Sequence, residues 1–99
     1  MPLQLSGKKV LVVGLARSGA AAARLAIREG ARVTVTDRRP AGELSQALVL
    51  LEGLPVSLSL GGHAEGDFTS PDLVVVSPGV PLTLPGIAAA RRAGIPVLG

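Results

Sequence analysis

Residues 8–19 read KKVLVVGLARSG, and this stretch decides the fold of the chain. The apolar run from Val10 to Val13 has no polar alternation, which is typical of a strand buried on both faces of a parallel sheet. Gly14 allows a tight turn after that strand, and Gly19 lets the following helix pack closely against it. The stretch therefore predicts a strand, a glycine turn and a helix, the first unit of an α/β fold.

The helix after this turn is predicted over 18–29. Ser18 is its candidate N-cap and Gly30 ends it, while Ala22, Leu25 and Ala26 fall on one face. Further strands are predicted over 32–36, 55–60, 72–77 and 95–98, helices over 43–52 and 84–93, and a helical turn over 64–68. In the helix over 43–52, the residues expected to face inward are Leu44, Ala47, Leu48 and Leu51.

Alternation of strands and helices along the chain predicts a parallel sheet with helices on both faces. Right-handed crossovers restrict the topology, so the expected fold is a Rossmann-like sheet of five strands in the order 3-2-1-4-5. A chain of 99 residues has room for one domain, which we place over 1–99. Pro55 at the start of the third strand suggests that this strand lies at an edge.

Composition excludes several classes of protein. Apolar residues make up 47% of the chain, which excludes a disordered segment. The absence of cysteine excludes disulfides and thiolate metal sites, and a single His cannot build a zinc site unaided. The first seven residues contain no long apolar stretch for a signal peptide or a membrane span. We therefore expect a cytoplasmic protein with no membrane partner.

The chain is basic, with ten Lys and Arg residues and a formal net charge of +3. These residues are spread along the sequence, and no aromatic residues lie between them for base stacking. Nucleic acid is therefore not the expected partner, although the charge leaves a nucleic-acid or protein interaction module as a third hypothesis. A small anionic ligand needs fewer positive charges and fits better.

Three loops are expected at the carboxyl ends of the predicted strands, where α/β sheets bind ligands. The turn over 14–19 exposes backbone amides at a helix start, which attract phosphate. The loop over 37–39 carries an acidic residue and two Arg residues, and the loop over 77–79 permits close approach of a ligand to the backbone. Together these loops predict one cleft that binds a phosphorylated ligand.

A dinucleotide such as NAD is one candidate ligand for this cleft. Asp37 favours it, because an acidic residue at this place holds ribose hydroxyls in NAD-binding proteins. Ala16 disfavours it, because the dinucleotide fingerprint has a glycine there. Arg38 and Arg39 suit a phosphate or a base carbonyl instead. His63 lies in a Gly-Gly-His turn and receives no role, and the sequence contains no catalytic dyad and no GxxxxGK[ST] phosphate loop.

At these segments the chain resembles the amino-terminal domain of the Mur ligases, and most of all the branch that adds D-glutamate. The resemblance covers nearly the whole chain and is carried by KKVLVVGLARSG, VTDRR, the GGH turn and DLVVVSPGVPLTLPGIAAARRAGIPVLG. It implies a three-domain cytoplasmic enzyme of peptidoglycan biosynthesis, whose first domain binds the UDP part of UDP-N-acetylmuramoyl-L-alanine. The sister ligase that adds L-alanine remains an alternative.

The resemblance also implies roles for particular residues. A pyrophosphate would lie on the turn that includes Leu15 and Ala16, with backbone contacts from Arg17 and Ser18. The loop over 37–39 would surround the uracil, and the loop over 77–79 would close the opposite side, with the Gly79 amide near phosphate. The candidate substrate-binding residues are thus Leu15, Ala16, Arg17, Ser18, Asp37, Arg38, Arg39, Ser77, Pro78 and Gly79.

The catalytic steps of such a ligase need parts that these 99 residues do not contain. The resemblance implies ATP and Mg²⁺ in a central domain, and a last domain that helps hold D-glutamate. No catalytic or metal-binding residue is predicted in this chain, and no cofactor is expected in its domain. We therefore expect the isolated domain to have no ligase activity.

Overall fold

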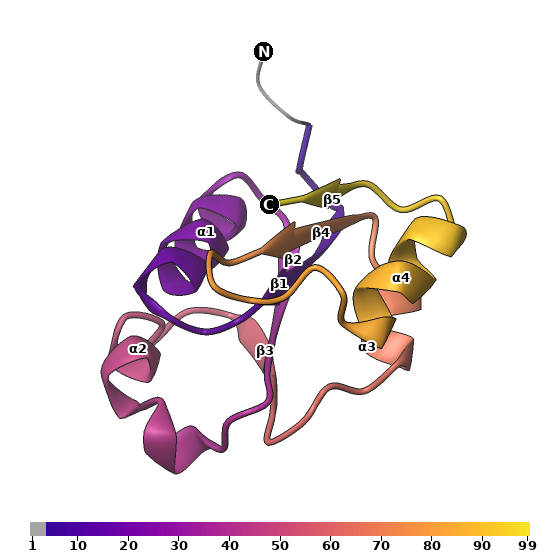
Figure 1. Cartoon of the computed structure of the whole chain (residues 1–99). Helices are drawn as coiled ribbons and strands as arrows, with labels where there is room; N and C mark the ends of the chain where they lie inside the picture. Colours follow the sequence, from indigo (N-terminus) through magenta and orange to yellow (C-terminus); the bar gives the residue numbers. More distant parts are fainter. Residues whose placement is uncertain (1–3) are drawn as a thin grey trace.

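The computed structural model describes residues 4–99, so the first three residues of the predicted domain lie outside the described part. Its core is one sheet flanked by helices (Figure 1). All strands are parallel and lie in the order β3-β2-β1-β4-β5, which confirms the predicted fold class and strand order. The strands are β1 (Lys9–Val13), β2 (Arg32–Asp37), β3 (Val56–Leu60), β4 (Leu73–Val76) and β5 (Val97–Leu98). β3 lies at an edge, as the proline before it predicts.

The register of the three central strands aligns their carboxyl ends. Val13 at the end of β1 pairs with Thr36 of β2 on one side and with Val76 of β4 on the other. The hydrogen bonds continue one residue further, from the amide of Gly14 to the carbonyl of Thr36 at 2.8 Å and from the amide of Ser77 to the carbonyl of Val13 at 2.9 Å. The loops after β1, β2 and β4 therefore leave the sheet at one level.

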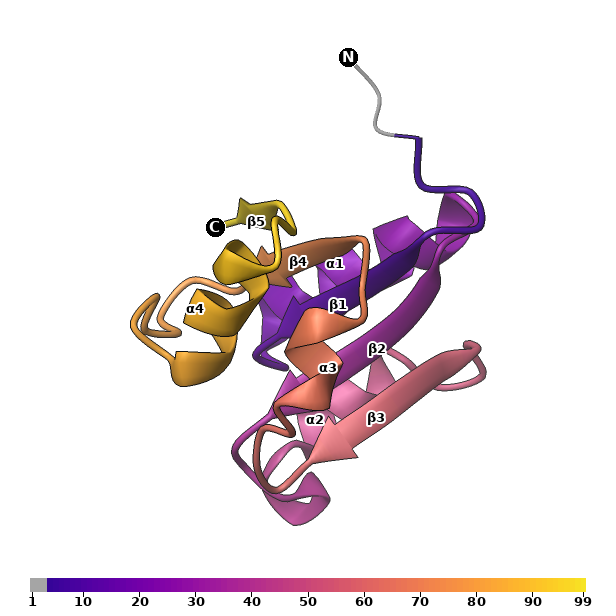
Figure 2. The same cartoon turned by 90° about the vertical axis from the view of Figure 1, so that its right-hand side faces the viewer.

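Helices cover both faces of the sheet, as Figure 2 shows, with α3 and α4 on one side and α1 and α2 on the other. Their bounds are α1 (Arg17–Arg28), α2 (Ser45–Val49), α3 (Gly66–Thr69) and α4 (Pro85–Arg92). Val10 and Val12 pack under α1 and α2, while Leu11 and Val13 pack under α3 and α4. Because both faces of β1 are buried, its sequence shows no polar alternation.

The first helix begins one residue earlier than predicted, and the prediction of Ser18 as its N-cap is wrong. Ala16 occupies the N-cap position in extended geometry, and within residues 4–99 no side-chain hydrogen bond caps the helix start. On the predicted common face of Ala22, Leu25 and Ala26, Leu25 is 55% exposed whereas Ala26 is buried. The buried residues of α1 are Gly19, Ala20, Ala23 and Ala26.

This face is made of small residues because the helix lies very close to the sheet at its first turn. A Cβ atom on Gly19 would lie 2.0 Å from the carbonyl oxygen of Gly14. Close approach at that point fixes the helical phase, so the positions that follow at helical spacing face the sheet. Gly30 follows the helix at φ +89°, as its predicted role as a helix stop requires.

The predicted helix over 43–52 is broken. A short 3₁₀ turn, η1 (Ala41–Glu43), is separated from α2 by Leu44, whose backbone at φ −121° and ψ 17° is not helical. The predicted inward face is nevertheless confirmed: Leu44 and Leu51 are buried, and Ala47 and Leu48 pack against the same core.

β5 has only two residues rather than the predicted four. The amide of Ile95 donates to the carbonyl of Ala90 at the end of α4, and Pro96 has no amide hydrogen to donate. The pairing with β4 is therefore limited to the last residues, where Val74 pairs with Val97.

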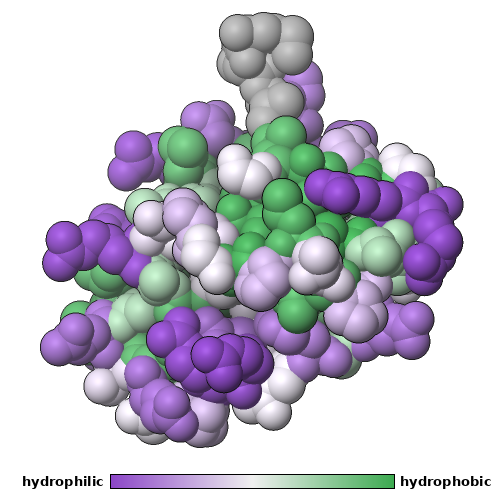
Figure 3. All heavy atoms as spheres, viewed as in Figure 1, coloured by the Kyte–Doolittle hydropathy of each residue, from purple (hydrophilic) through white to green (hydrophobic). Residues whose placement is uncertain are grey.

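The surface near β5 carries both apolar and hydrophilic side chains. On the face of the molecule drawn in Figure 3, an apolar area lies over the part of the sheet that carries β4 and β5, and hydrophilic side chains surround it. Leu98 of β5 is 44% exposed. Within residues 4–99, no helix has the length and apolar character needed to cross a membrane.

Candidate functional site

A cavity of about 510 Å³ lies at the carboxyl end of the sheet, between the loops after β1, β2 and β4. The structure therefore brings the three predicted loops together, because the register places the ends of their strands at one level. Seven of the ten predicted site residues line this cavity: Ala16, Asp37, Arg38, Arg39, Ser77, Pro78 and Gly79.

The other three predicted residues lie beside this cavity rather than in its wall. Leu15 and Arg17 line a neighbouring cavity of about 500 Å³ next to α2, and Arg39 lines both cavities. The side chain of Leu15 belongs to the hydrophobic core and is 1% exposed. Ser18 lines neither cavity and lies in the first turn of α1.

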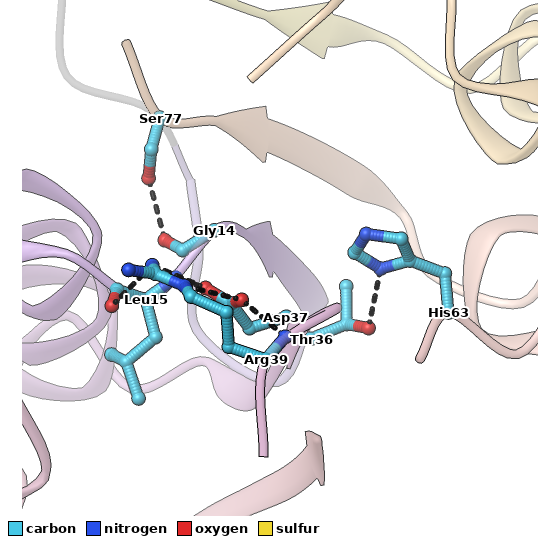
Figure 4. A network of polar contacts seen from close by, with 7 residues as sticks. All are labelled: Gly14, Leu15, Thr36, Asp37, Arg39, His63 and Ser77. Carbon is cyan, nitrogen blue, oxygen red and sulfur yellow. Dashed lines mark hydrogen bonds and ion pairs between the residues drawn. The ribbon is translucent and has the colours of Figure 1, made fainter. Parts of the chain in front are cut away.

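The turn after β1 is tightly packed against the loop after β4. Gly14 has φ +94°, and a Cβ atom there would lie 2.7 Å from a methyl carbon of Val80. The hydroxyl of Ser77 donates a hydrogen bond of 2.7 Å to the carbonyl of Gly14 (Figure 4). Ser77 is 5% exposed, so its side chain joins β4 to the turn and leaves the backbone of the next residues to meet a ligand.

The start of α1 offers backbone donors to a ligand. The first amide that bonds back into the helix is that of Ala20, which donates to the carbonyl of Ala16. Within residues 4–99, the amides of residues 16–19 make no hydrogen bond, whereas the amide of Leu15 donates to Asp37. Free amides at a helix start, reinforced by the helix dipole, bind anions such as phosphate.

Asp37 ends β2, and its carboxylate is directed into the protein. Its Oδ2 accepts from the amide of Leu15 at 2.7 Å and from Nη2 of Arg39 at 2.9 Å. Its Oδ1 accepts from the amide of Arg39 at 2.8 Å and from Nε of Arg39 at 3.0 Å. A carboxylate has about four acceptor sites, so this one has none free for the hydroxyls of a ribose.

This arrangement stabilises the charged form of Asp37, which is 3% exposed. Burial by itself raises the pKa of the carboxyl group, but the hydrogen bonds from Arg39 and Leu15 and the charge of Arg39 outweigh it and lower the pKa to about 2. The same ion pair raises the pKa of Arg39. The pair therefore stays charged over the whole physiological pH range.

Arg39 is held in place while part of it stays accessible. Its guanidinium is fixed by Asp37 and contacts the carbonyl of Leu15 at 3.4 Å, yet the side chain is 38% exposed. The neighbouring Arg38 is exposed and lines the same cavity. Two cationic side chains thus stand at the β2 end of a cavity whose β1 end is lined by Ala16, the first residue of the free amides.

The loop after β4 supplies open backbone on the opposite side. Gly79 has φ +92° and is exposed, and among residues 4–99 a Cβ atom built on it meets nothing within 4 Å apart from its two chain neighbours. The space beside it belongs to the cavity, so a ligand can approach the backbone closely there. Pro78 lines the cavity next to it.

Several wall residues of this cavity were not among the sequence candidates. Val80, Pro81 and Leu84 form an apolar side, and His63 stands at the end of β2 with its Nδ1 2.9 Å from the hydroxyl of Thr36. One signal could have found His63: it follows β3 within three residues, at the edge of the sheet where the other three loops lie. The apolar residues carry no comparable signal.

A metal site would need several His, Cys, Asp or Glu side chains close together. Among residues 4–99 there is no group of three His, Cys, Asp or Glu side chains that could hold a metal ion. The resemblance assigns Mg²⁺ and ATP to a central domain rather than to these residues.

Solved structures with the same fold include several dehydrogenases. A UDP-glucose dehydrogenase from Pyrobaculum islandicum superposes with a TM-score of 0.69 at 26% identity, over 97% of this chain and 26% of that one. The precorrin-2 dehydrogenase SirC superposes with a TM-score of 0.65 at 20% identity, over 98% of this chain and 46% of that one. The second likeness shows the fold alone.

Sequence comparison gives a more specific result. The chain is 62% identical over 96 residues to a UDP-N-acetylmuramoylalanine--D-glutamate ligase from Anaeromyxobacter dehalogenans, which covers 97% of this chain and 21% of the relative. A ligase of the same name from Geobacter metallireducens is 54% identical over 96 residues, with the same two coverages. The chain thus spans about a fifth of the length of these curated relatives.

The match to a protein family extends over almost the entire chain. Residues 8–99 match the family described as "Mur ligase MurD-like, N-terminal domain". This range contains all three loops of the cavity and every predicted site residue. The chain therefore belongs to the family of Mur ligase MurD-like N-terminal domains.

Proposed function

We propose that this chain binds the UDP part of UDP-N-acetylmuramoyl-L-alanine, as the N-terminal domain of an ATP-dependent ligase that adds D-glutamate in peptidoglycan biosynthesis. The observation that carries the proposal is the cavity itself. Ala16, where the run of free amides begins, lines its β1 end, two Arg residues line its β2 end, and open glycine backbone lies after β4. The names of relatives up to 62% identical supply the substrate and the amino acid.

Within this proposal, each end of the cavity has its own part of the ligand. The pyrophosphate lies between the amides of residues 16–19 and the backbone of Gly79, where the helix dipole favours negative charge. The uracil lies near Arg38 and Arg39 at the end of β2. Asp37 acts through its neighbours, because its carboxylate holds Arg39 and the turn at Leu15 in place.

A NAD-binding module is the main alternative, and the dehydrogenases of similar fold are consistent with it. Two observations weigh against it. Asp37 has no free acceptor for ribose hydroxyls, and Ala16 places a methyl group where the dinucleotide fingerprint has a glycine. The sister ligase that adds L-alanine is disfavoured by the D-glutamate ligase names of the relatives.

The parts of the enzyme beyond this domain are proposed from the family and not from the residues described above. We propose that residues 1–99 form one substrate-binding domain, and that ATP, Mg²⁺ and D-glutamate bind to further domains of a cytoplasmic enzyme. Neither nucleic acid nor a membrane is a partner in this proposal. The 99-residue chain alone is then expected to form no amide from ATP, D-glutamate and the muramoyl substrate.

Calorimetric titration of the chain with UDP, NAD and a short DNA duplex tests the proposal. UDP should give saturable binding, while NAD and DNA at the same concentrations should give no heat beyond dilution. Binding of NAD without UDP would favour the dinucleotide module, and salt-dependent DNA binding would favour the interaction module. ATP-dependent amide formation by the isolated chain would contradict the proposal that ATP, Mg²⁺ and D-glutamate bind to further domains.

A further inference from the structure

His63 belongs to a loop whose backbone is fixed to the end of β2. The amide of Gly61 donates to the carbonyl of Arg39 at 2.9 Å, and the amide of Gly62 donates to the carbonyl of Asp37 at 3.2 Å. These bonds fold the segment after β3 back over the loop of residues 37–39. The residue that follows, His63, is thereby placed at the wall of the cavity.

The imidazole ring of His63 is held on two sides. Its Nδ1 lies 2.9 Å from the hydroxyl of Thr36, a residue that is completely buried. Its ring also meets Phe68 edge-on, with the centroids 5.7 Å apart and the planes at 78°. A hydrogen bond and an aromatic contact together leave the ring one orientation, so its remaining nitrogen has a fixed direction.

That nitrogen, Nε2, makes no hydrogen bond within residues 4–99. Figure 4 shows it on the side of the ring that faces Gly14 and Ser77, the residues at the ends of β1 and β4. His63 is half-buried and lines the same cavity as Arg38 and Gly79. The cavity wall therefore includes one oriented polar atom beyond the predicted site residues.

We propose that His63 is a further binding residue of this site, and that its Nε2 forms a hydrogen bond with the polar edge of the pyrimidine base. This inference rests on the proposed binding of a uridine nucleotide. The base is the nearer part of that ligand because His63 stands beside Thr36 at the end of β2, next to Arg38 and Arg39. The free amides that suit phosphate lie at the ends of other strands.

The chemistry of uracil fits either tautomer of the ring. Its edge carries an imide N–H between two carbonyl oxygens, so it offers a donor and acceptors side by side. If Nδ1 carries the proton, Nε2 accepts from the imide N–H. If the Thr36 hydroxyl donates to Nδ1, Nε2–H donates to a carbonyl oxygen.

Two substitutions separate the two ring nitrogens. His63→Asn keeps a polar atom near the Nδ1 position and can retain the bond to Thr36, but it removes Nε2. His63→Gln keeps a polar atom near the Nε2 position and gives up the bond to Thr36. Each variant is titrated with UDP and with inorganic pyrophosphate, and its thermal unfolding is measured beside that of the unaltered chain.

The proposal predicts that His63→Asn weakens UDP binding about tenfold, since a lost hydrogen bond to a ligand has an effect of this order. His63→Gln should stay within about threefold of the unaltered chain, and pyrophosphate binding should be the same in all three proteins. UDP binding by a folded His63→Asn variant at the unaltered strength would overturn the proposal. Equal loss of UDP and pyrophosphate affinity in that variant would overturn the assignment to the base.

A second measurement needs no variant. The imidazole nitrogen signals of His63 in the unaltered chain should shift when UDP is added and stay in place with pyrophosphate. Binding of UDP with unchanged His63 nitrogens overturns this inference alone. Failure of the unaltered chain to bind UDP overturns the proposed function, and the role of His63 falls with it.

Discussion

Asp37 occupies the place where a dinucleotide-binding protein holds ribose hydroxyls, yet its carboxylate serves the protein itself. It accepts four hydrogen bonds, from Leu15 and from three nitrogens of Arg39. These bonds tie the turn after β1 to the loop after β2. At the scale of single residues, the site is therefore built by side chains that hold backbone and neighbours in position.

The pH dependence of stability should reveal this carboxylate. Its pKa is about 2 in the folded chain against 3.8 for an ordinary Asp, so it contributes stability that is fully present above pH 4 and is lost as the pH falls toward 2. A shift of this size corresponds to about 2 kcal/mol of free energy of unfolding. Urea unfolding between pH 7 and pH 2 measures it.

The matched variant is Asp37→Asn, which removes the charge and leaves buried donors poorly paired. It should lower the free energy of unfolding at pH 7 by about 2 kcal/mol and flatten the decline below pH 4. Asp72→Asn is the control, since the carboxylate of Asp72 is exposed and accepts one hydrogen bond from the described residues, from the amide of Lys9. An unchanged decline below pH 4 in Asp37→Asn would show that other groups cause it.

The open space beside the backbone of Gly79 can be tested by filling it. Gly79→Val places a branched side chain in the space where a phosphate would approach, so UDP affinity should fall about tenfold or more. Gly94→Val is the control, because Gly94 has a similar positive φ of +79° and a Cβ atom there also meets nothing within 4 Å. Both variants carry comparable backbone strain, but Gly94 does not line the cavity. Undiminished UDP binding by a folded Gly79→Val variant would mean that the cleft is wrongly placed.

At the scale of elements, the contact between α1 and the turn after β1 sets the geometry of the site. The close approach at Gly19 explains why the buried face of α1 consists of small residues and why Leu25 lies outside it. It also keeps Gly19 beside Ser77, whose hydroxyl bonds to the carbonyl of Gly14 in the same place.

Gly19→Ala should therefore disturb the whole helix start. Its Cβ atom would lie 2.0 Å from the carbonyl oxygen of Gly14 and 2.8 Å from the hydroxyl of Ser77, so α1 must move away from the sheet. We expect a loss of about 2 kcal/mol or more in the free energy of unfolding. Gly42→Ala is the matched control, because Gly42 is exposed and has open space around it. Equal stability of the two variants, measured by urea unfolding, would contradict the proposed packing.

At the scale of the whole molecule, the sequence alone predicts the parallel sheet, its strand order and the meeting of its loops at one edge. Buried apolar runs such as Val10–Val13 identify parallel strands, and the alternation of strands and helices leaves few topologies. The carboxyl ends of parallel strands share an edge, which is why loops 37–39 and 77–79 could be assigned to one cleft without a structure.

Side-chain partners between distant segments could not be predicted in this way. The bond from Ser77 to Gly14 joins residues 63 positions apart, and the contact between His63 and Thr36 spans 27 positions. Such contacts depend on side-chain orientations that no periodicity records. The same is true of the break at Leu44, where helical spacing of apolar residues persists although the backbone is not helical.

In the proposed function, this cavity holds a uridine nucleotide across the ends of β1, β2 and β4. The most direct test is a ¹H–¹⁵N titration of the 99-residue chain with UDP and, separately, with NAD. We expect UDP to shift the backbone amides of Arg17, Asp37, Arg39 and Gly79, and NAD to leave them unchanged. Shifts of these amides with NAD and none with UDP would contradict the proposed function.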